Sequence, residues 1–227
     1  MCFQESICRL QEEARLFLTE SGLVLNGVSI LPKEIEVYFY KKDIFEDDSV
    51  HRNELQKHNK NHFYVHRRGT KQSDSYKGGN RAGLDFVVSN DENTYYSYLI
   101  RSATINNRSI VGPHKVLEAI KSATHMDYKE IENTPVKVVH NNVLCDVLYS
   151  YRINLGKKVQ EEYRICKLRA VICDEMFRNE KYPAKEKLVV DFLLEKVKMH
   201  NTPQEQAAKY AKDKLGYIPS VIKDLRP

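Results

Sequence analysis

The sequence predicts an α+β fold: a single domain with a mostly antiparallel, curved β core, flanking helices and two extra C-terminal helices. Apolar residues recur at helical spacing at both ends of the chain and once in the middle. Between those segments, apolar and polar residues alternate with the period of two that is typical of strands. Turn sequences, rather than helices, separate most of these runs, which favours antiparallel pairing over βαβ units.

Length and composition narrow the class of protein. The 227 residues are enough for one sizeable core, and the net charge of +5 permits a polyanionic partner without demanding one. No apolar run reaches the roughly 18–20 residues that cross a bilayer, and the N-terminus lacks a signal-peptide pattern. The five cysteines are odd in number and contain no Cys-x-x-Cys pair, so neither a disulfide scaffold nor a zinc knuckle is predicted. We expect a cytoplasmic monomer without a cofactor or a metal.

The expected elements follow from the apolar periodicity and from the turn signals between runs. Helices are expected at residues 4–20, 115–122, 184–200 and 204–215, and strands at residues 23–30, 34–40, 63–65, 84–88, 95–105, 136–140, 143–155 and 166–173. Residues 41–62 are predicted to form a long loop or a short helix, and residues 69–83 a loop. We divide the chain into a domain over residues 1–182 and a helical extension over residues 183–227 that packs on the same domain.

Local signals set several of these boundaries. Gly22 follows the first helical run and is placed to cap it. Asn26-Gly27 favours a tight hairpin turn within the first predicted strand segment. Pro32 is expected to separate that segment from the next strand. Gly112-Pro113 opens the middle helix, because proline is well tolerated in the first helical turn.

Two carboxylates and a tyrosine lie on one face of the second predicted strand. Glu34, Glu36 and Tyr38 are spaced by two residues, so their side chains point the same way. One interpretation is a solvated strand face that carries charges. The other is a general base, Glu36, whose pKa is raised by an apolar and aromatic setting. The spacing alone does not choose between them.

The segment from Lys57 to Arg81 is strongly basic. It contains seven lysines and arginines against the single acid Asp74, with histidines and aromatic residues interleaved. Such a run is often only a solvated face, but interleaved basic and aromatic side chains are typical of nucleic-acid binding. The helix start at Gly112-Pro113 is followed by His114 and Lys115, which makes it either a phosphate site or an ordinary helix start. We favour contact with nucleic acid.

Six short motifs then occur in an order that resembles the alkyladenine (3-methylpurine) DNA glycosylases, over roughly residues 8–175. They are Glu34-x-Glu36-x-Tyr38, Asp47-Asp48 with His51, Tyr64-Val65-His66 continuing to Gly69, Tyr98-Leu99-Ile100-Arg101-Ser102-Ala103, Gly112-Pro113-His114-Lys115-Val116-Leu117, and Arg152-Ile153-Asn154-Leu155-Gly156 followed by Leu168-Arg169. His66 stands where that family has tyrosine, and Asp85 stands in the place of an asparagine. The wedging tyrosine of the family is not matched, and Arg68 or the following loop would have to replace it.

The resemblance implies a role for each matched position. Glu36 would activate a water, and Arg101 would help to hold that water together with a backbone carbonyl near Leu155. Asp85 would discriminate among bases. Tyr38, His51 and His66 would form the stacking pocket. The phosphates would be contacted by the basic residues Arg67, Arg68, Lys71, Lys77, Arg81, Lys115 and Arg152.

The leading hypothesis is therefore a DNA glycosylase that flips out a modified base and hydrolyses its N-glycosidic bond. No lysine is evidently placed to form a Schiff base, so a monofunctional enzyme without lyase activity is predicted. The substrate would be an alkylated purine or another modified base, including one from foreign or phage DNA. Two alternatives remain, a non-catalytic nucleic-acid-binding module on the same fold and an enzyme that acts on free nucleosides. The C-terminal helices fall outside the resemblance.

Overall fold

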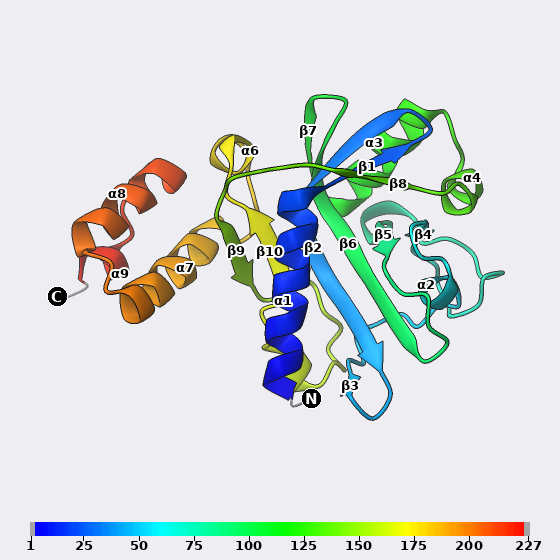
Figure 1. Ribbon diagram of the computed structural model, residues 1–227, viewed down its shortest axis with the longest axis horizontal. Helices are drawn as coiled ribbons and strands as arrows, with labels where there is room; N and C mark the ends of the chain where they lie inside the picture. Colours follow the sequence, from blue (N-terminus) through cyan, green and yellow to red (C-terminus); the bar gives the residue numbers. More distant parts are fainter. Residues whose placement is uncertain (1–2, 225–227) are drawn as a thin grey trace.

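The computed structural model describes residues 3–224, and only the backbone of residues 199 and 200. It confirms the α+β fold, with helices around a curled antiparallel sheet (Figure 1). The strands are β1 (Ser21–Leu25), β2 (Val28–Lys41), β3 (Phe45–Glu46), β4 (Phe63–Val65), β5 (Leu84–Val87), β6 (Thr94–Ile105), β7 (Arg108–Val111), β8 (Lys137–His140), β9 (Val147–Ser150) and β10 (Arg169–Ile172). The helices are α1 (Phe3–Glu20), α2 (Leu55–His58), α3 (Pro113–Thr124), α4 (Tyr128–Asn133), α5 (Glu161–Arg164), α6 (Glu175–Asn179), α7 (Lys185–His200), α8 (Gln204–Leu215) and α9 (Ser220–Lys223).

Strand β2 is the centre of the sheet. It pairs along one edge with β6, and along the other edge first with β1 and then with β10. The main path of the sheet is β4-β5-β6-β2-β1-β8, with β7 added to β6 and β9 added to β10, and these pairings are antiparallel. Because β2 carries Glu34, Glu36 and Tyr38, these side chains lie on the central strand of the sheet.

Two predicted boundaries are wrong, one within β2 and one between α1 and β1. The strand continues through Pro32, with register shifts against β6 on both sides of Glu34. A proline lacks the N–H that a ladder needs, and a bulge beside it lets the pairing continue. Gly22 is not a helix cap but lies in β1 opposite Val139, where a Cβ atom would come within 3.0 Å of Leu31 and 3.1 Å of Val139. A larger residue at position 22 would therefore need the side chains of Leu31 and Val139 to shift by a few tenths of an ångström.

The register assigns the side chains of the sheet to two faces. Residues directly opposite each other on paired strands share a face, as Phe86 and Tyr98 do. Helix α1 covers this face, where the ring of Phe17 lies 5.3 Å from the ring of Phe86 and 4.6 Å from that of Tyr98. Glu36 pairs with Leu99, which follows Tyr98 and so points to the opposite face. The candidate site therefore lies on the face that α1 leaves open.

Most of the remaining strand predictions are confirmed in position, and one is wrong over most of its length. The turn at Asn26-Gly27 has positive φ at both residues (47° and 79°), as a tight hairpin turn of this type requires. Of the strand predicted at residues 143–155, only Val147–Ser150 forms, and residues 151–160 form a loop instead. The strand predicted at 166–173 is shortened to β10. The short elements β3, β7, α4, α5, α6 and α9 were not anticipated, because a few residues carry too little periodicity.

The four cysteines within the described residues are free thiols. Two of them, Cys166 and Cys173, are buried, and burial raises the pKa of each thiol to about 11. Such thiols behave as small apolar core residues. Among the helices of the part of the chain that is described, none is long and apolar enough to cross a membrane.

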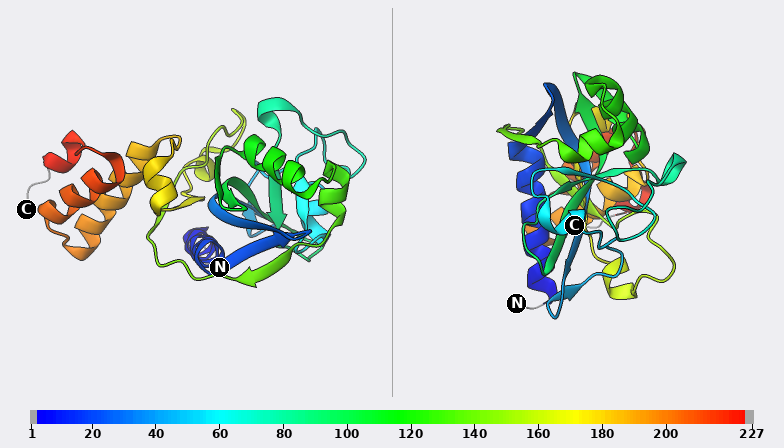
Figure 2. Two further views of the ribbon diagram at one scale, coloured as in Figure 1. Left: turned by 90° about the horizontal axis from the view of Figure 1, so that it is seen from above. Right: turned by 90° about the vertical axis from the view of Figure 1, so that its right-hand side faces the viewer.

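The C-terminal helices have their own apolar cluster. Helices α7, α8 and α9 extend away from the sheet, as Figure 2 shows. Their buried side chains, such as Leu188 and Ala207, join Phe177 of α6, Leu148 of β9 and Val171 of β10 in one cluster. The extension is therefore attached through the edge of the sheet, and its cluster begins ahead of the boundary expected at residue 183.

Phe177→Ala should lower the free energy of unfolding by about 3–5 kcal/mol, because it opens a cavity in this cluster. Phe177 is fully buried, whereas Phe192 of α7 is only partly buried. Phe192→Ala is the matched control and should cost clearly less. Urea denaturation of both variants measures the difference, and equal losses would contradict the arrangement of the cluster.

Candidate functional site

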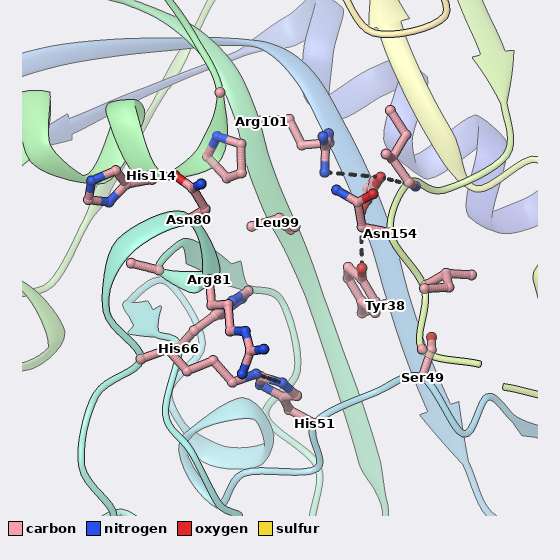
Figure 3. A pocket seen from close by; sticks show the side chains of 18 of the residues that line it. Tyr38, Ser49, His51, His66, Asn80, Arg81, Leu99, Arg101, His114 and Asn154 are labelled. Carbon is pink, nitrogen blue, oxygen red and sulfur yellow. Dashed lines mark hydrogen bonds and ion pairs between the residues drawn. The ribbon is translucent and has the colours of Figure 1, made fainter. Parts of the chain in front are cut away.

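A pocket of about 710 Å³ opens on the face of the sheet opposite α1. Figure 3 shows Arg101 and Asn154 on one side of it and His51 and His66 on the other, with Leu99 between them. The pocket brings together predicted residues that are up to 79 positions apart in the chain. The predicted residues that line it are Glu36, Tyr38, His51, His66, Lys77, Arg81, Arg101 and Lys115.

Glu36 is a fully buried carboxylate held by three donors. Its Oε1 accepts a hydrogen bond of 2.6 Å from the backbone N–H of Ile153 and lies 3.2 Å from Nη1 of Arg101. Its Oε2 accepts a hydrogen bond of 3.0 Å from the hydroxyl of Tyr38. The interpretation of this strand face as solvated is therefore wrong. The expected apolar setting is also wrong, because charged and polar donors surround the carboxylate.

Arg101 connects both carboxylates of β2. Its Nε donates to Oε1 of Glu34 at 3.0 Å, and Oε1 of Glu34 also accepts a bond of 2.7 Å from Nε of Arg169 on β10. Burial acts to lower the pKa of Arg101, but the carboxylates of Glu36 and Glu34 raise it, so the guanidinium stays charged. Strands β2, β6 and β10 are thus joined by ion pairs beneath the pocket.

The loop after β9 forms the wall beside Glu36. Arg152 anchors it, since the buried guanidinium donates to the carbonyl of Val37 at 3.2 Å and to Asp47 at 2.5 Å. The next residue, Ile153, presents its N–H to Glu36. Asn154 then adopts a φ of 60°, a left-handed conformation that asparagine tolerates better than most residues. The backbone is thereby turned so that residues 153–156 line the pocket.

Rings form the walls farther from Glu36. His51 and His66 lie with ring centroids 5.1 Å apart, and Tyr64 lies behind both of them. Burial lowers the pKa of His51 to about 4, helped by the charges of His66 and of Lys77, whose Nζ contacts Nε2 of His51. Burial and the charge of Glu36 raise the pKa of Tyr38 well above its ordinary value, so its hydroxyl remains a donor. Among the described residues, no group of three His, Cys, Asp or Glu side chains could hold a metal ion.

Asp85 does not line the main pocket but a smaller cavity of about 60 Å³ beside it. Its Oδ1 lies 2.7 Å from Nε2 of His66, and its Oδ2 accepts bonds from Gln56 (3.0 Å) and Ser97 (2.8 Å). Burial acts to raise the pKa of Asp85, yet His66 and Ser97 hold it below the ordinary value. Gln56, which is buried and lines this cavity, was missed, since a glutamine in a charged segment carries no sequence signal of its own.

The mouth of the pocket is basic. The basic residues Lys77, Arg81, Lys115 and Lys158 line the pocket in addition to Arg101, whereas its acidic residues are the partly buried Asp48 and the fully buried Glu36. Burial lowers the pKa of Lys77, whereas Arg81, Lys115 and Lys158 are exposed. Lys158 was missed because it lies just beyond a segment that was predicted to be strand.

Two of the predicted phosphate contacts are wrong. Arg67 is buried and pairs with Glu132. Its guanidinium also lies over the ring of Tyr76, with Cζ 4.1 Å from the ring centroid. Arg152 is buried with Asp47, so neither guanidinium can reach a phosphate. The charge of each buried arginine is instead balanced by its carboxylate partner inside the protein. Arg68 and Lys71 are exposed but do not line the pocket, and their contacts remain predictions.

Arg152→Ala should lower the free energy of unfolding by about 3–5 kcal/mol, because it leaves the buried carboxylate of Asp47 without its partner. The exposed Arg68 supplies the control, and Arg68→Ala should stay within about 0.5 kcal/mol of the unmodified protein. Urea denaturation measures both. An Arg152→Ala protein that keeps its stability but binds DNA less tightly would instead support a phosphate contact by Arg152.

Comparison of the chain with protein-family models and with curated proteins found no match. The function of the pocket therefore has to be inferred from its own residues and geometry.

Proposed function

We propose that this chain is a DNA glycosylase that takes up a modified base flipped out of DNA and hydrolyses its N-glycosidic bond. The observation that carries the proposal is the position of Glu36, a fully buried carboxylate that nevertheless lines a large pocket. A carboxylate beside the sugar can act as the general base in hydrolysis of a glycosidic bond, and flat side chains nearby can stack on the base. The pocket offers both within one cavity.

In the proposed reaction, Glu36 accepts a proton from a water as the water oxygen attacks C1′ of the sugar. The electron pair of the N-glycosidic bond leaves with the base, and an abasic site remains. Tyr38 and the N–H of Ile153 fix the orientation of the carboxylate through hydrogen bonds of 3.0 Å and 2.6 Å. Its negative charge also stabilises the oxocarbenium-like sugar of the transition state.

The ring walls offset the cost of flipping. Moving a nucleotide out of the stack costs a few kcal/mol, and stacking on an aromatic side chain recovers about 1–3 kcal/mol per base. Tyr38, His51 and His66 lie on the walls of the pocket and can serve as stacking partners. The lysines and the arginine at the mouth supply positive charge where the DNA backbone would pass.

Glu36→Gln should reduce the single-turnover rate of base release about 10²–10⁴-fold, because a carboxamide cannot accept the proton of the attacking water. The assay uses oligonucleotides that carry candidate modified bases and scores strand breaks after alkali. A mass-spectrometric screen of bases released from differently modified genomic DNAs selects the substrates. The variant should bind the same DNA as tightly as the unmodified protein does.

Three other outcomes are informative. Full activity in Glu36→Gln would overturn the mechanism. Salt-dependent DNA binding without base release on any substrate would assign a non-catalytic nucleic-acid-binding module instead. Strand breaks without alkali would contradict a monofunctional enzyme. Borohydride trapping would then test whether Lys77, the half-buried amine of the pocket, forms a Schiff base with the DNA.

The double variant Lys115→Ala/Lys158→Ala should weaken DNA binding and flatten its salt dependence, by about 0.9 in the log–log slope for each phosphate that is no longer neutralised. Both lysines are exposed at the mouth of the pocket. The control is Lys209→Ala/Lys223→Ala, which removes two exposed lysines from the C-terminal helices. Fluorescence anisotropy over a salt series measures the slope. Equal effects of the two double variants would place the DNA elsewhere.

A further inference from the structure

Every residue that lines the small cavity beside the main pocket carries a polar side-chain atom, while the larger part of the lining surface belongs to carbon atoms of these residues. It shares Tyr38, Ser49, His51 and His66 with the main pocket and adds Gln56 and Asp85. Its volume of about 60 Å³ is that of about two water molecules, or of a substituent with two or three heavy atoms. Whatever occupies the main pocket can therefore extend a small group into this cavity.

The donors of the cavity are already engaged. Nε2 of Gln56 donates both hydrogens, to Oδ2 of Asp85 (3.0 Å) and to Oγ of Ser97 (3.1 Å). The hydroxyl of Ser49 donates to Asp47 at 2.6 Å, and that of Tyr38 donates to Glu36. Within the described residues, Nδ1 of His66 is the ring nitrogen of this cavity that has no protein partner. The cavity thus has almost no donor to offer.

Its acceptors, in contrast, are only partly used by the described residues. Oδ1 of Asp85 has His66 as its partner, Oε1 of Gln56 accepts from the N–H of Asn53, and Oγ of Ser49 accepts from Arg152. A carboxylate or carbonyl oxygen can accept two hydrogen bonds, and a hydroxyl oxygen can accept two besides donating one. Each of these three oxygens therefore keeps an unused lone pair.

We infer that this cavity is a subsite for a hydrogen-bond-donating substituent, a hydroxyl or a primary amine, carried by the base that enters the main pocket. The inference rests on the proposed function and names the class of its substrate. A methyl group would leave the lone pairs of Asp85, Gln56 and Ser49 unsatisfied. A carboxylate would bring a second negative charge beside buried Asp85, where the low dielectric strengthens the repulsion.

Two matched series of oligonucleotides test the subsite. One carries cytosine with a hydroxymethyl, methyl or carboxyl group at C5, and the other carries 7-deazaguanine with an aminomethyl, methyl or carboxyl group at C7. In at least one series, single-turnover base release should be about 10–100-fold faster for the donor than for the methyl member, as expected for a hydrogen bond to a charged group. The carboxyl member should be slowest.

Asp85→Asn should reduce the donor-to-methyl ratio to within about threefold, because one acceptor oxygen becomes an NH₂ group. Asp48→Asn makes the same change at a carboxylate that lines only the main pocket, and it should leave the ratio as it is. If Asp85→Asn fails to fold, Ser49→Ala provides a second test, since Arg152 keeps its bonds to Asp47 and the carbonyl of Val37.

Failure of this inference is distinguishable from failure of the proposed function. The subsite is overturned if bases are released without a preference for the donor member over the methyl member, or if that preference survives both Asp85→Asn and Ser49→Ala. Either result still supports the proposed glycosylase activity. No base release from any member of either series, or from the modified genomic DNAs, overturns the glycosylase and the subsite together.

Discussion

The ion pairs of Arg101 with Glu34 and Glu36 are the interaction on which the rest of the structure depends. Removing two carboxylates from water is costly, and in a buried position it is offset only when charged partners are close. Arg101 and Arg169 supply those partners from the strands on either side of β2. The same contacts hold β6, β2 and β10 together and fix the carboxylate of Glu36 at the pocket.

A second set of contacts places the loop after β9 against that carboxylate. The buried pair of Arg152 and Asp47 anchors the loop to the segment after β3, so the N–H of Ile153 is directed at Glu36. Arg152 and Arg67, the two buried arginines to which the resemblance assigned phosphate contacts, instead pair with Asp47 and Glu132 inside the protein. Pre-organisation of the site is therefore built from internal charges, and the exposed lysines at the mouth remain free for a polyanion.

The two buried carboxylates that face the cavities differ in their partners. Glu36 is surrounded by a guanidinium, a backbone N–H and a phenol, whereas Asp85 is surrounded by an imidazole, an amide and a hydroxyl. Environment assigns different roles to identical chemical groups. In the reaction proposed above, one carboxylate handles the attacking water and the other belongs to the recognition of the base.

The sequence alone determined the α+β class, the hairpin at Asn26-Gly27 and the shared face of Glu36 and Tyr38, because these depend on local periodicity and turn chemistry. Only the tertiary structure decided which charges are buried. Arg152 and Lys158 are basic residues only six positions apart, yet the first pairs with Asp47 and the second lies at the mouth of the pocket. Burial is set by contacts between segments that are distant in the chain, and a local sequence pattern does not record those contacts.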